Sequence, residues 1–112
     1  NVEFIHGNVY SDSFMFPTAD VVYIDAGHNH DQVCQDIDRC VNELNKPILI
    51  FDDCSPKRYV DGNIGNSIIT AINQKIEEGK IGIIKYIGAN AGYKSGNGKV
   101  LTGIEGMICK VI

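Results

Sequence analysis

Three aspartates stand at the ends of two short apolar runs in the first half of the sequence. Asp25 directly follows Val21–Ile24, and Asp52 and Asp53 directly follow Ile48–Phe51. Carboxylate oxygens, with water completing the coordination, suit Mg²⁺, Ca²⁺ or Mn²⁺ better than zinc. Acids at strand ends also cap helices or stay solvated, so spacing alone leaves both interpretations open. The first interpretation predicts a divalent metal site.

Two histidines follow the first of these acids. His28 and His30 lie three and five positions beyond Asp25. An imidazole can act as a general base near neutral pH, whereas a loop histidine can equally hydrogen-bond to backbone. His28 and His30 are therefore the candidate catalytic residues. A nucleophilic alternative, with Cys54 or Ser55 beside His28, lacks an elbow motif such as GxSxG.

A helix between the two apolar runs would bring these residues together. Asn29 and Gln32 have the spacing of a capping box at a helix start. The apolar residues that then recur at helical spacing are Val33, Ile37, Val41 and Leu44. Two short apolar runs separated by such a helix predict a βαβ unit with parallel strands. Ligands collect beyond the carboxyl ends of such strands, at an edge that we call the rim.

The remaining sequence predicts more elements of the same kind. Further strands are expected at Val2–His6, Ile81–Ile87 and Leu101–Ile112. A second amphipathic helix, ended by Gly79, has the apolar residues Ile64, Ile68, Ile72 and Ile76. The order predicts one α/β domain over residues 1–112, with a Rossmann-like, mostly parallel sheet that ends in an antiparallel hairpin.

Two glycine-rich or polar stretches are predicted as loops. Residues 54–66 would pass over the rim. Gly88–Lys99 contains Asn97-Gly98, a strong hairpin signal. Its glycines also resemble a phosphate-binding loop, but no helix follows them, and a helix start is what makes such loops bind phosphate. The hairpin is therefore the preferred interpretation.

Composition excludes several classes of function. The 112 residues carry a net charge of −4, which is unfavourable for a nucleic acid partner because phosphate binding needs a basic stripe. No run approaches the roughly 20 apolar residues of a membrane span, so we expect no membrane partner. The four cysteines form no CxxC pair, which predicts free thiols in a cytoplasmic protein. Because an apolar run begins directly at Asn1, we expect a piece of a longer protein.

The run VVYIDAGHNHDQVCQDI, followed by ILIFDDCS, resembles the carboxyl-terminal half of class I S-adenosylmethionine-dependent methyltransferases. The resemblance is to small-molecule O-methyltransferases whose fourth strand ends in an Asp-x-x-His motif and whose fifth ends in an acidic pair. It implies a methyl transfer to a small-molecule hydroxyl, assisted by a divalent metal, typically Mg²⁺. By resemblance, Asp25, Asp52 and Asp53 would be the metal ligands.

The resemblance also implies roles for the residues near these ligands. His28 would remove the proton from the substrate hydroxyl, with His30 as the second choice. Gly7 and Asn8 fall where relatives close the third strand over the adenine of S-adenosylmethionine. Relatives often have Asp at the position of Asn8.

The chain matches only half of the family's domain, truncated before its cofactor loop. It contains no GxGxG, so we expect this chain alone to bind S-adenosylmethionine poorly and to be inactive. The competing interpretation is a non-catalytic α/β module that keeps the fold and perhaps a metal. Without the missing strands, Val2–His6 would pair beside Val21–Ile24 or with another copy, and a homodimer is the favoured outcome.

Overall fold

The two apolar runs that carry the aspartates form neighbouring parallel strands, as predicted. The computed structural model describes residues 2–54, 63–88, 93–94, 100–101 and 105–112. In it, β1 (Val21–Ile24) pairs in parallel with β2 (Ile48–Phe51), and Ile24 stands opposite Phe51. The residues after Ile24 and Phe51 therefore leave the sheet side by side, at the same edge.

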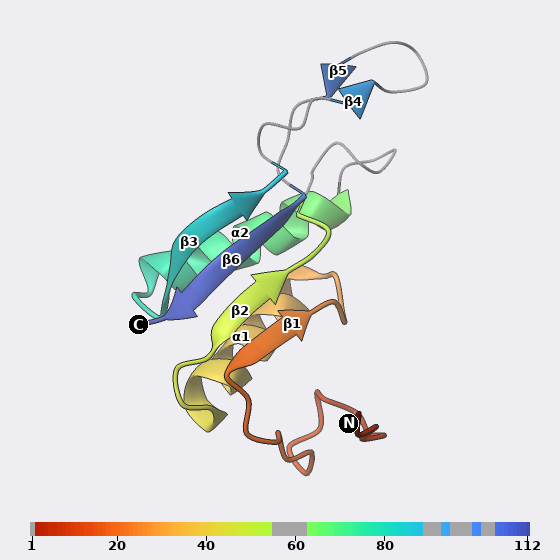
Figure 1. Ribbon diagram of the computed structural model, residues 1–112, viewed down its shortest axis with the longest axis vertical. Coiled ribbons are helices and arrows are strands. Elements are labelled where there is room, and N and C mark those ends of the chain that lie inside the picture. Colours follow the sequence, from red (N-terminus) through yellow and green to blue (C-terminus); the bar gives the residue numbers. More distant parts are fainter. Residues whose placement is uncertain (1, 55–62, 89–92, 95–99, 102–104) are drawn as a thin grey trace.

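Four strands form one mixed sheet in the order β1-β2-β6-β3 (Figure 1). β3 (Ile81–Ile87) and β6 (Gly106–Val111) are its last two strands along the chain. β6 lies between β2 and β3 and is antiparallel to both. The α/β class and the antiparallel pairing of the last two long strands are confirmed. The sheet is mixed: β1, β2 and β3 run in the same direction, and β6 runs opposite to them.

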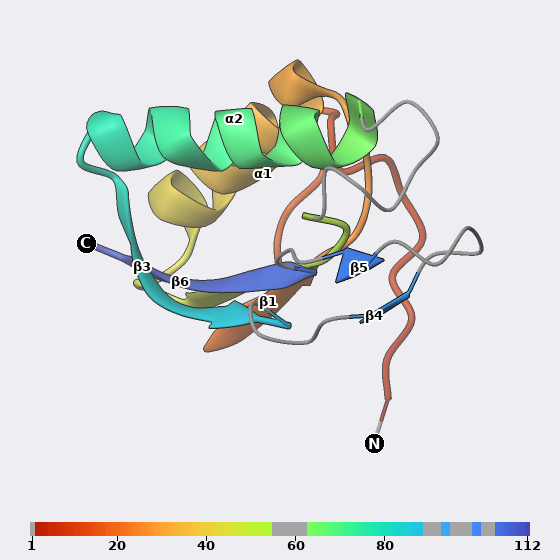
Figure 2. The ribbon, with the colours of Figure 1, turned by 90° about the horizontal axis from the view of Figure 1, so that it is seen from above.

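Two helices lie side by side on one face of this sheet (Figure 2). They are α1 (His30–Glu43) and α2 (Asn63–Glu77). The largest side chains buried between the helices and the sheet include Ile37, Leu49, Phe51, Ile72 and Ile81. No helix within the described residues is long and apolar enough to cross a membrane.

The helix ends follow the signals in the sequence. Asn29 caps α1, since its Oδ1 accepts a hydrogen bond of 2.8 Å from the backbone N–H of Gln32. Gly79 follows α2 with φ of 76°, and its N–H donates to the carbonyl oxygen of Ile76 at 2.9 Å. This left-handed conformation is one that glycine adopts without strain.

The predicted strand Val2–His6 is wrong. Residues 2–6 form no strand, and β1 pairs only with β2 among the described strands. Phe4 is 94% exposed, so its side chain does not pack against the rest of the molecule. The preference of apolar and β-branched residues for strands arises from packing against a neighbouring strand. An apolar run without such a neighbour is therefore not stabilised as a strand.

Arg39 of α1 holds the segment that precedes β1. Its guanidinium donates hydrogen bonds to the backbone carbonyl oxygens of Val9, Ser11 and Phe14. It also pairs with Glu43, with 2.6 Å between Nε and Oε2. This segment therefore lies against α1 and reaches the rim, although it contains no strand.

The end of the chain differs in detail from its prediction. β4 (Tyr93–Lys94) and β5 (Val100–Leu101) pair antiparallel as a separate two-stranded sheet. Because Val100–Leu101 pairs with β4, the last long strand begins at Gly106 instead of Leu101. The Asn97-Gly98 turn, and residues 55–62 of the predicted loop over the rim, lie outside the described residues.

Candidate functional site

Asp25, His28 and Asp53 come together at the rim. Nε2 of His28 lies 3.5 Å from Oδ1 of Asp25 and 3.3 Å from Oδ2 of Asp53. One ligand atom from each of the three residues lies within 4.8 Å of the other two. The structure thus unites two acids and one histidine that the sequence singles out, from the ends of two parallel strands.

The backbone of Asp53 makes this convergence possible. Its φ is 56°, in the left-handed region that residues with a side chain seldom adopt. In a continuing strand, Asp52 and Asp53 would face opposite sides of the sheet. The turn at Asp53 instead directs its carboxylate toward His28, and this carboxylate is mostly buried, with 15% of the side chain exposed.

Asp52 makes different contacts. Its Oδ2 accepts a hydrogen bond of 2.7 Å from the hydroxyl of Tyr23, and its Oδ1 accepts one of 2.8 Å from the backbone N–H of Asp53. The Asp52 hydrogen bond raises the pKa of Tyr23 to about 12. Asp52 therefore supports the turn at Asp53 and holds Tyr23, and it is not one of the three converging residues.

Gly27 lies between Asp25 and His28, and two neighbours fix it. Its N–H donates a hydrogen bond of 2.7 Å to the hydroxyl of Tyr10. A Cβ on Gly27 would lie 2.6 Å from this hydroxyl and 2.2 Å from Oε1 of Gln32. The segment before β1 and the first turn of α1 thus hold the loop that carries His28.

Gly106 allows β6 to begin directly beside the rim. A Cβ at this position would lie 2.7 Å from the carbonyl oxygen of Phe51. One residue earlier, the carbonyl oxygen of Glu105 accepts a hydrogen bond of 2.9 Å from the N–H of Cys54. The sheet therefore holds the Asp52-Asp53 turn from both ends. Sequence reasoning missed Tyr10, Tyr23, Gly27 and Gly106 as supports, because each acts through a contact distant in the chain.

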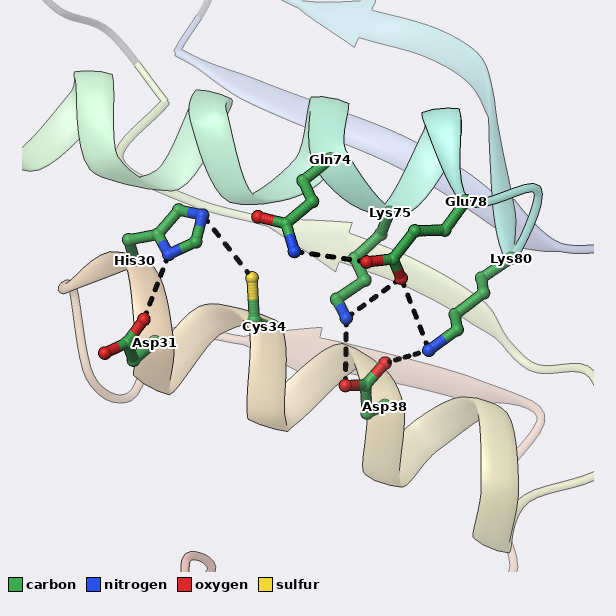
Figure 3. Close-up of polar contacts among 8 residues, drawn as sticks. All are labelled: His30, Asp31, Cys34, Asp38, Gln74, Lys75, Glu78 and Lys80. Carbon is green, nitrogen blue, oxygen red and sulfur yellow. Dashed lines mark hydrogen bonds and ion pairs between the residues drawn. The ribbon is translucent and has the colours of Figure 1, made fainter.

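His30 does not join His28. Its Nδ1 lies 3.1 Å from Oδ1 of Asp31, and its Nε2 lies 3.7 Å from Sγ of Cys34 (Figure 3). As the first residue of α1, it points along the helix toward the groove that borders α2. The structure thus separates the two candidate catalytic histidines.

Gly7 and Asn8 form a turn in the segment before β1. Oδ1 of Asn8 accepts a hydrogen bond of 3.0 Å from the N–H of Tyr10, and its carbonyl oxygen accepts one from Ser11. A Cβ on Gly7 would lie 2.6 Å from the ring of Phe14. Both residues are exposed. Their connection to the rim runs through Tyr10, whose hydroxyl binds Gly27.

Asp36 is a buried acid behind the rim. It is 6% exposed and its Oδ2 has no hydrogen-bond partner within the described residues. Burial raises its pKa to about 6, although Tyr10 and Arg39 act in the opposite direction. The helical stripe of the sequence does not include Asp36, so nothing in the spacing indicated that this acid would be buried.

The three converging residues have the donor atoms of a divalent metal site. Nε2 of His28 is buried and makes no hydrogen bond within the described residues, although two carboxylate oxygens lie close to it. Bonds of about 2.1 Å to a small cation would bring neighbouring ligand atoms to about 3 Å from one another. The ligand oxygens of Asp25 and Asp53 lie within 4.8 Å of each other, so their closure toward that spacing would hold a cation and leave the lone pair of His28 Nε2 for a proton.

Comparisons with family models, curated proteins and solved structures give no match. The function is therefore inferred from the chemistry of the rim and the order of the elements around it.

Proposed function

We propose that this chain is the carboxyl-terminal half of a Rossmann-like, S-adenosylmethionine-dependent O-methyltransferase domain, whose rim holds a divalent cation. The observation that carries the proposal is the convergence of Asp25, His28 and Asp53. The order of elements supports it, since the parallel β1–α1–β2 unit is followed by a helix and an antiparallel closing pair. The complete domain would methylate a small-molecule hydroxyl.

Each rim residue has a chemical task in this proposal. Asp25 and Asp53 would hold the cation, typically Mg²⁺, with Asp52 placing Asp53. When bound, the cation supplies a Lewis acid that polarises the acceptor hydroxyl. His28, fixed between the two carboxylates, would take the proton of that hydroxyl. Asp52 also holds the hydroxyl of Tyr23 by its hydrogen bond, which raises the pKa of Tyr23 to about 12.

The metal part of the proposal can be tested on this chain directly. Titration with Mn²⁺, followed by electron paramagnetic resonance, should show one bound ion per chain. The double variant Asp25→Asn with Asp53→Asn should abolish binding. Asp20→Asn is the matched control, because Asp20 is an exposed aspartate at the opposite end of β1. Mn²⁺ binding that survives in the double variant would contradict the proposed site.

A second candidate function is a non-catalytic α/β module that retains the metal site. Among the described strands, β1 pairs only with β2, and Val21 and Tyr23, 56% and 58% exposed, leave one face of β1 uncovered. A module that lacks the glycine-rich cofactor loop would leave this edge and face free, which favours this candidate. Calorimetry with S-adenosylmethionine separates the two. Micromolar binding by this chain favours the enzyme, and Mn²⁺ binding without any heat from S-adenosylmethionine favours the module.

A further inference from the structure

A thiol and an imidazole face each other in a groove that the rim does not use. The groove runs along α1, has a volume of about 520 Å³, and is bordered by Gln74 of α2 and Asp12 of the preceding segment. Cys34 is 9% exposed and its Sγ lies 3.7 Å from Nε2 of His30 (Figure 3). Their spacing of four residues places both side chains on one face of α1.

The distance between these two atoms fits a shared metal ion. A tetrahedral zinc with bonds of about 2.3 Å to sulfur and about 2.05 Å to nitrogen separates those two ligand atoms by about 3.6 Å. The observed separation is 3.7 Å. Neither side chain would have to leave its place on the helix to bind the same ion.

The carboxylate of Asp31 contacts the ring of His30 as an acid commonly contacts a metal-binding histidine. Oδ1 of Asp31 lies 3.1 Å from Nδ1 of His30. With the Nδ1 proton donated to Asp31, the lone pair of Nε2 is directed toward Cys34. A histidine that ligates a metal commonly donates its other N–H to a carboxylate in this manner.

The charge of the groove favours a cation over an anion. Its acidic lining residues are Asp12, Asp31, Asp38 and Glu43. Two of these acids are already paired, Asp38 with Lys75 at 2.9 Å and Glu43 with Arg39, so the excess negative charge of the groove comes from Asp12 and Asp31. Burial raises the pKa of the Cys34 thiol, and the carboxylate of Asp38 raises it further, while Lys75 opposes them. A bare thiolate nucleophile is therefore disfavoured here, whereas a bound cation would neutralise the sulfur.

We propose that Cys34 Sγ and His30 Nε2 bind a thiophilic divalent cation such as Zn²⁺ or Cd²⁺, with Asp31 as a positioning residue. Binding forms one metal–sulfur and one metal–nitrogen bond, and the thiol proton passes to water without any change of oxidation state. Water completes the coordination on the open side of the groove. Thiolate and imidazole suit such ions, whereas the carboxylates of the rim suit Mg²⁺ or Mn²⁺. This site is therefore independent of the proposed methyltransferase function.

The test is a titration of the reduced, metal-free chain with Cd²⁺, followed by the thiolate-to-cadmium charge-transfer absorption. One equivalent should produce the band, and an excess of Mg²⁺ should leave it unchanged. Cys34→Ser should abolish it. His30→Gln, at the exposed first turn of α1, should weaken Cd²⁺ binding by more than tenfold, and Asp31→Asn should weaken it by roughly tenfold.

Two controls make the outcome specific. Asp53→Asn should leave the cadmium band intact, because Asp53 belongs to the rim. Circular dichroism should show the same helix content in each variant. Absence of the band in the wild-type chain, its persistence in Cys34→Ser, or an unchanged Cd²⁺ affinity in His30→Gln would overturn the proposal. So would rapid alkylation of Cys34 by iodoacetamide without cadmium binding, since that result indicates a reactive thiol.

Discussion

Nε2 of His28 lies 3.3 Å from Oδ2 of Asp53, although the two residues follow different strands. The parallel pairing of β1 and β2 brings their ends together, and the left-handed backbone of Asp53 turns its carboxylate toward the ring. Asp52, one residue earlier, binds Tyr23 instead. Within the acidic pair, Asp53 therefore contacts His28, and Asp52 supports the turn at Asp53.

This division predicts different effects for the two neighbouring aspartates. Asp53→Asn should lower Mn²⁺ affinity by about a hundredfold or more, because it removes a ligand charge. Asp52→Asn should lower it by about tenfold, the usual effect of a residue that orients a ligand. Titration of each single variant with Mn²⁺ measures both values. Equal losses would mean that Asp52 is itself a ligand.

The close approach of Gly106 to the backbone of Phe51 predicts that a side chain at this position would disturb the rim. Gly106→Ala would drive a methyl group to 2.7 Å from the carbonyl oxygen of Phe51, and the backbone that leads to Asp52 would have to move. We expect a loss of about 1–3 kcal/mol in the free energy of unfolding, together with weaker Mn²⁺ binding. Urea denaturation measures the first effect.

The matched control for this substitution is Gly82→Ala on β3. A Cβ at Gly82 would meet no atom closer than 3.7 Å, so the change should cost no more than about 0.5 kcal/mol. Equal destabilisation by the two substitutions would contradict the role given to Gly106.

Much of the architecture could be predicted from local signals. The apolar run of β2, the cap at Asn29 and the glycine after α2 each act within a few residues, so their positions follow from the sequence. The strand order could not be predicted, because β6 enters between β2 and β3 through contacts between distant residues. The run Val2–His6 has the composition of a strand, but composition does not show whether a neighbouring strand is present to pair with it.

The same distinction applies to the rim. Asp25 and His28 are close in sequence, and their meeting with Asp53 follows from the parallel pair. The spacing could not indicate that His30 would turn toward Cys34, since the start of α1 between His28 and His30 sends the two rings in different directions. Nor could it indicate the hydrogen bond from Gly27 to Tyr10, which joins residues 17 positions apart.

Asp36 predicts a pH dependence of stability. Its pKa in the folded chain, about 6, lies above the ordinary value of about 3.9. The folded state therefore binds the Asp36 proton more tightly than the unfolded state. The contribution of this group is fully present below about pH 4 and is lost as the pH rises through about 6, by about 3 kcal/mol in total.

The comparison with Asp36→Asn isolates this contribution, because other acids titrate in the same range. Chemical denaturation of both proteins at about pH 4.5 and about pH 7.5 gives the double difference in unfolding free energy. The wild-type chain should lose more stability than Asp36→Asn over this interval. An unchanged difference between the two proteins would show that Asp36 titrates normally.

The open edge of β1 predicts self-association. Val21 and Tyr23 are more than half exposed, and β1 pairs only with β2 among the described strands. An edge strand with unpaired backbone groups and apolar side chains readily pairs with another strand. We expect sedimentation velocity to show a dimer whose fraction rises with concentration.

A charge placed on this edge should prevent that pairing. Val21→Lys puts an ammonium group where two β1 strands would meet, so the dimer fraction should fall sharply. Ile84→Lys on β3, the opposite edge strand, changes an equally exposed residue, 52% against 56%, and should leave the dimer intact. A wild-type chain that sediments as a monomer at all concentrations would contradict the prediction. A dimer that is lost only in Ile84→Lys would place the interface at β3, because the added charge disrupts pairing only at the strand that forms the interface.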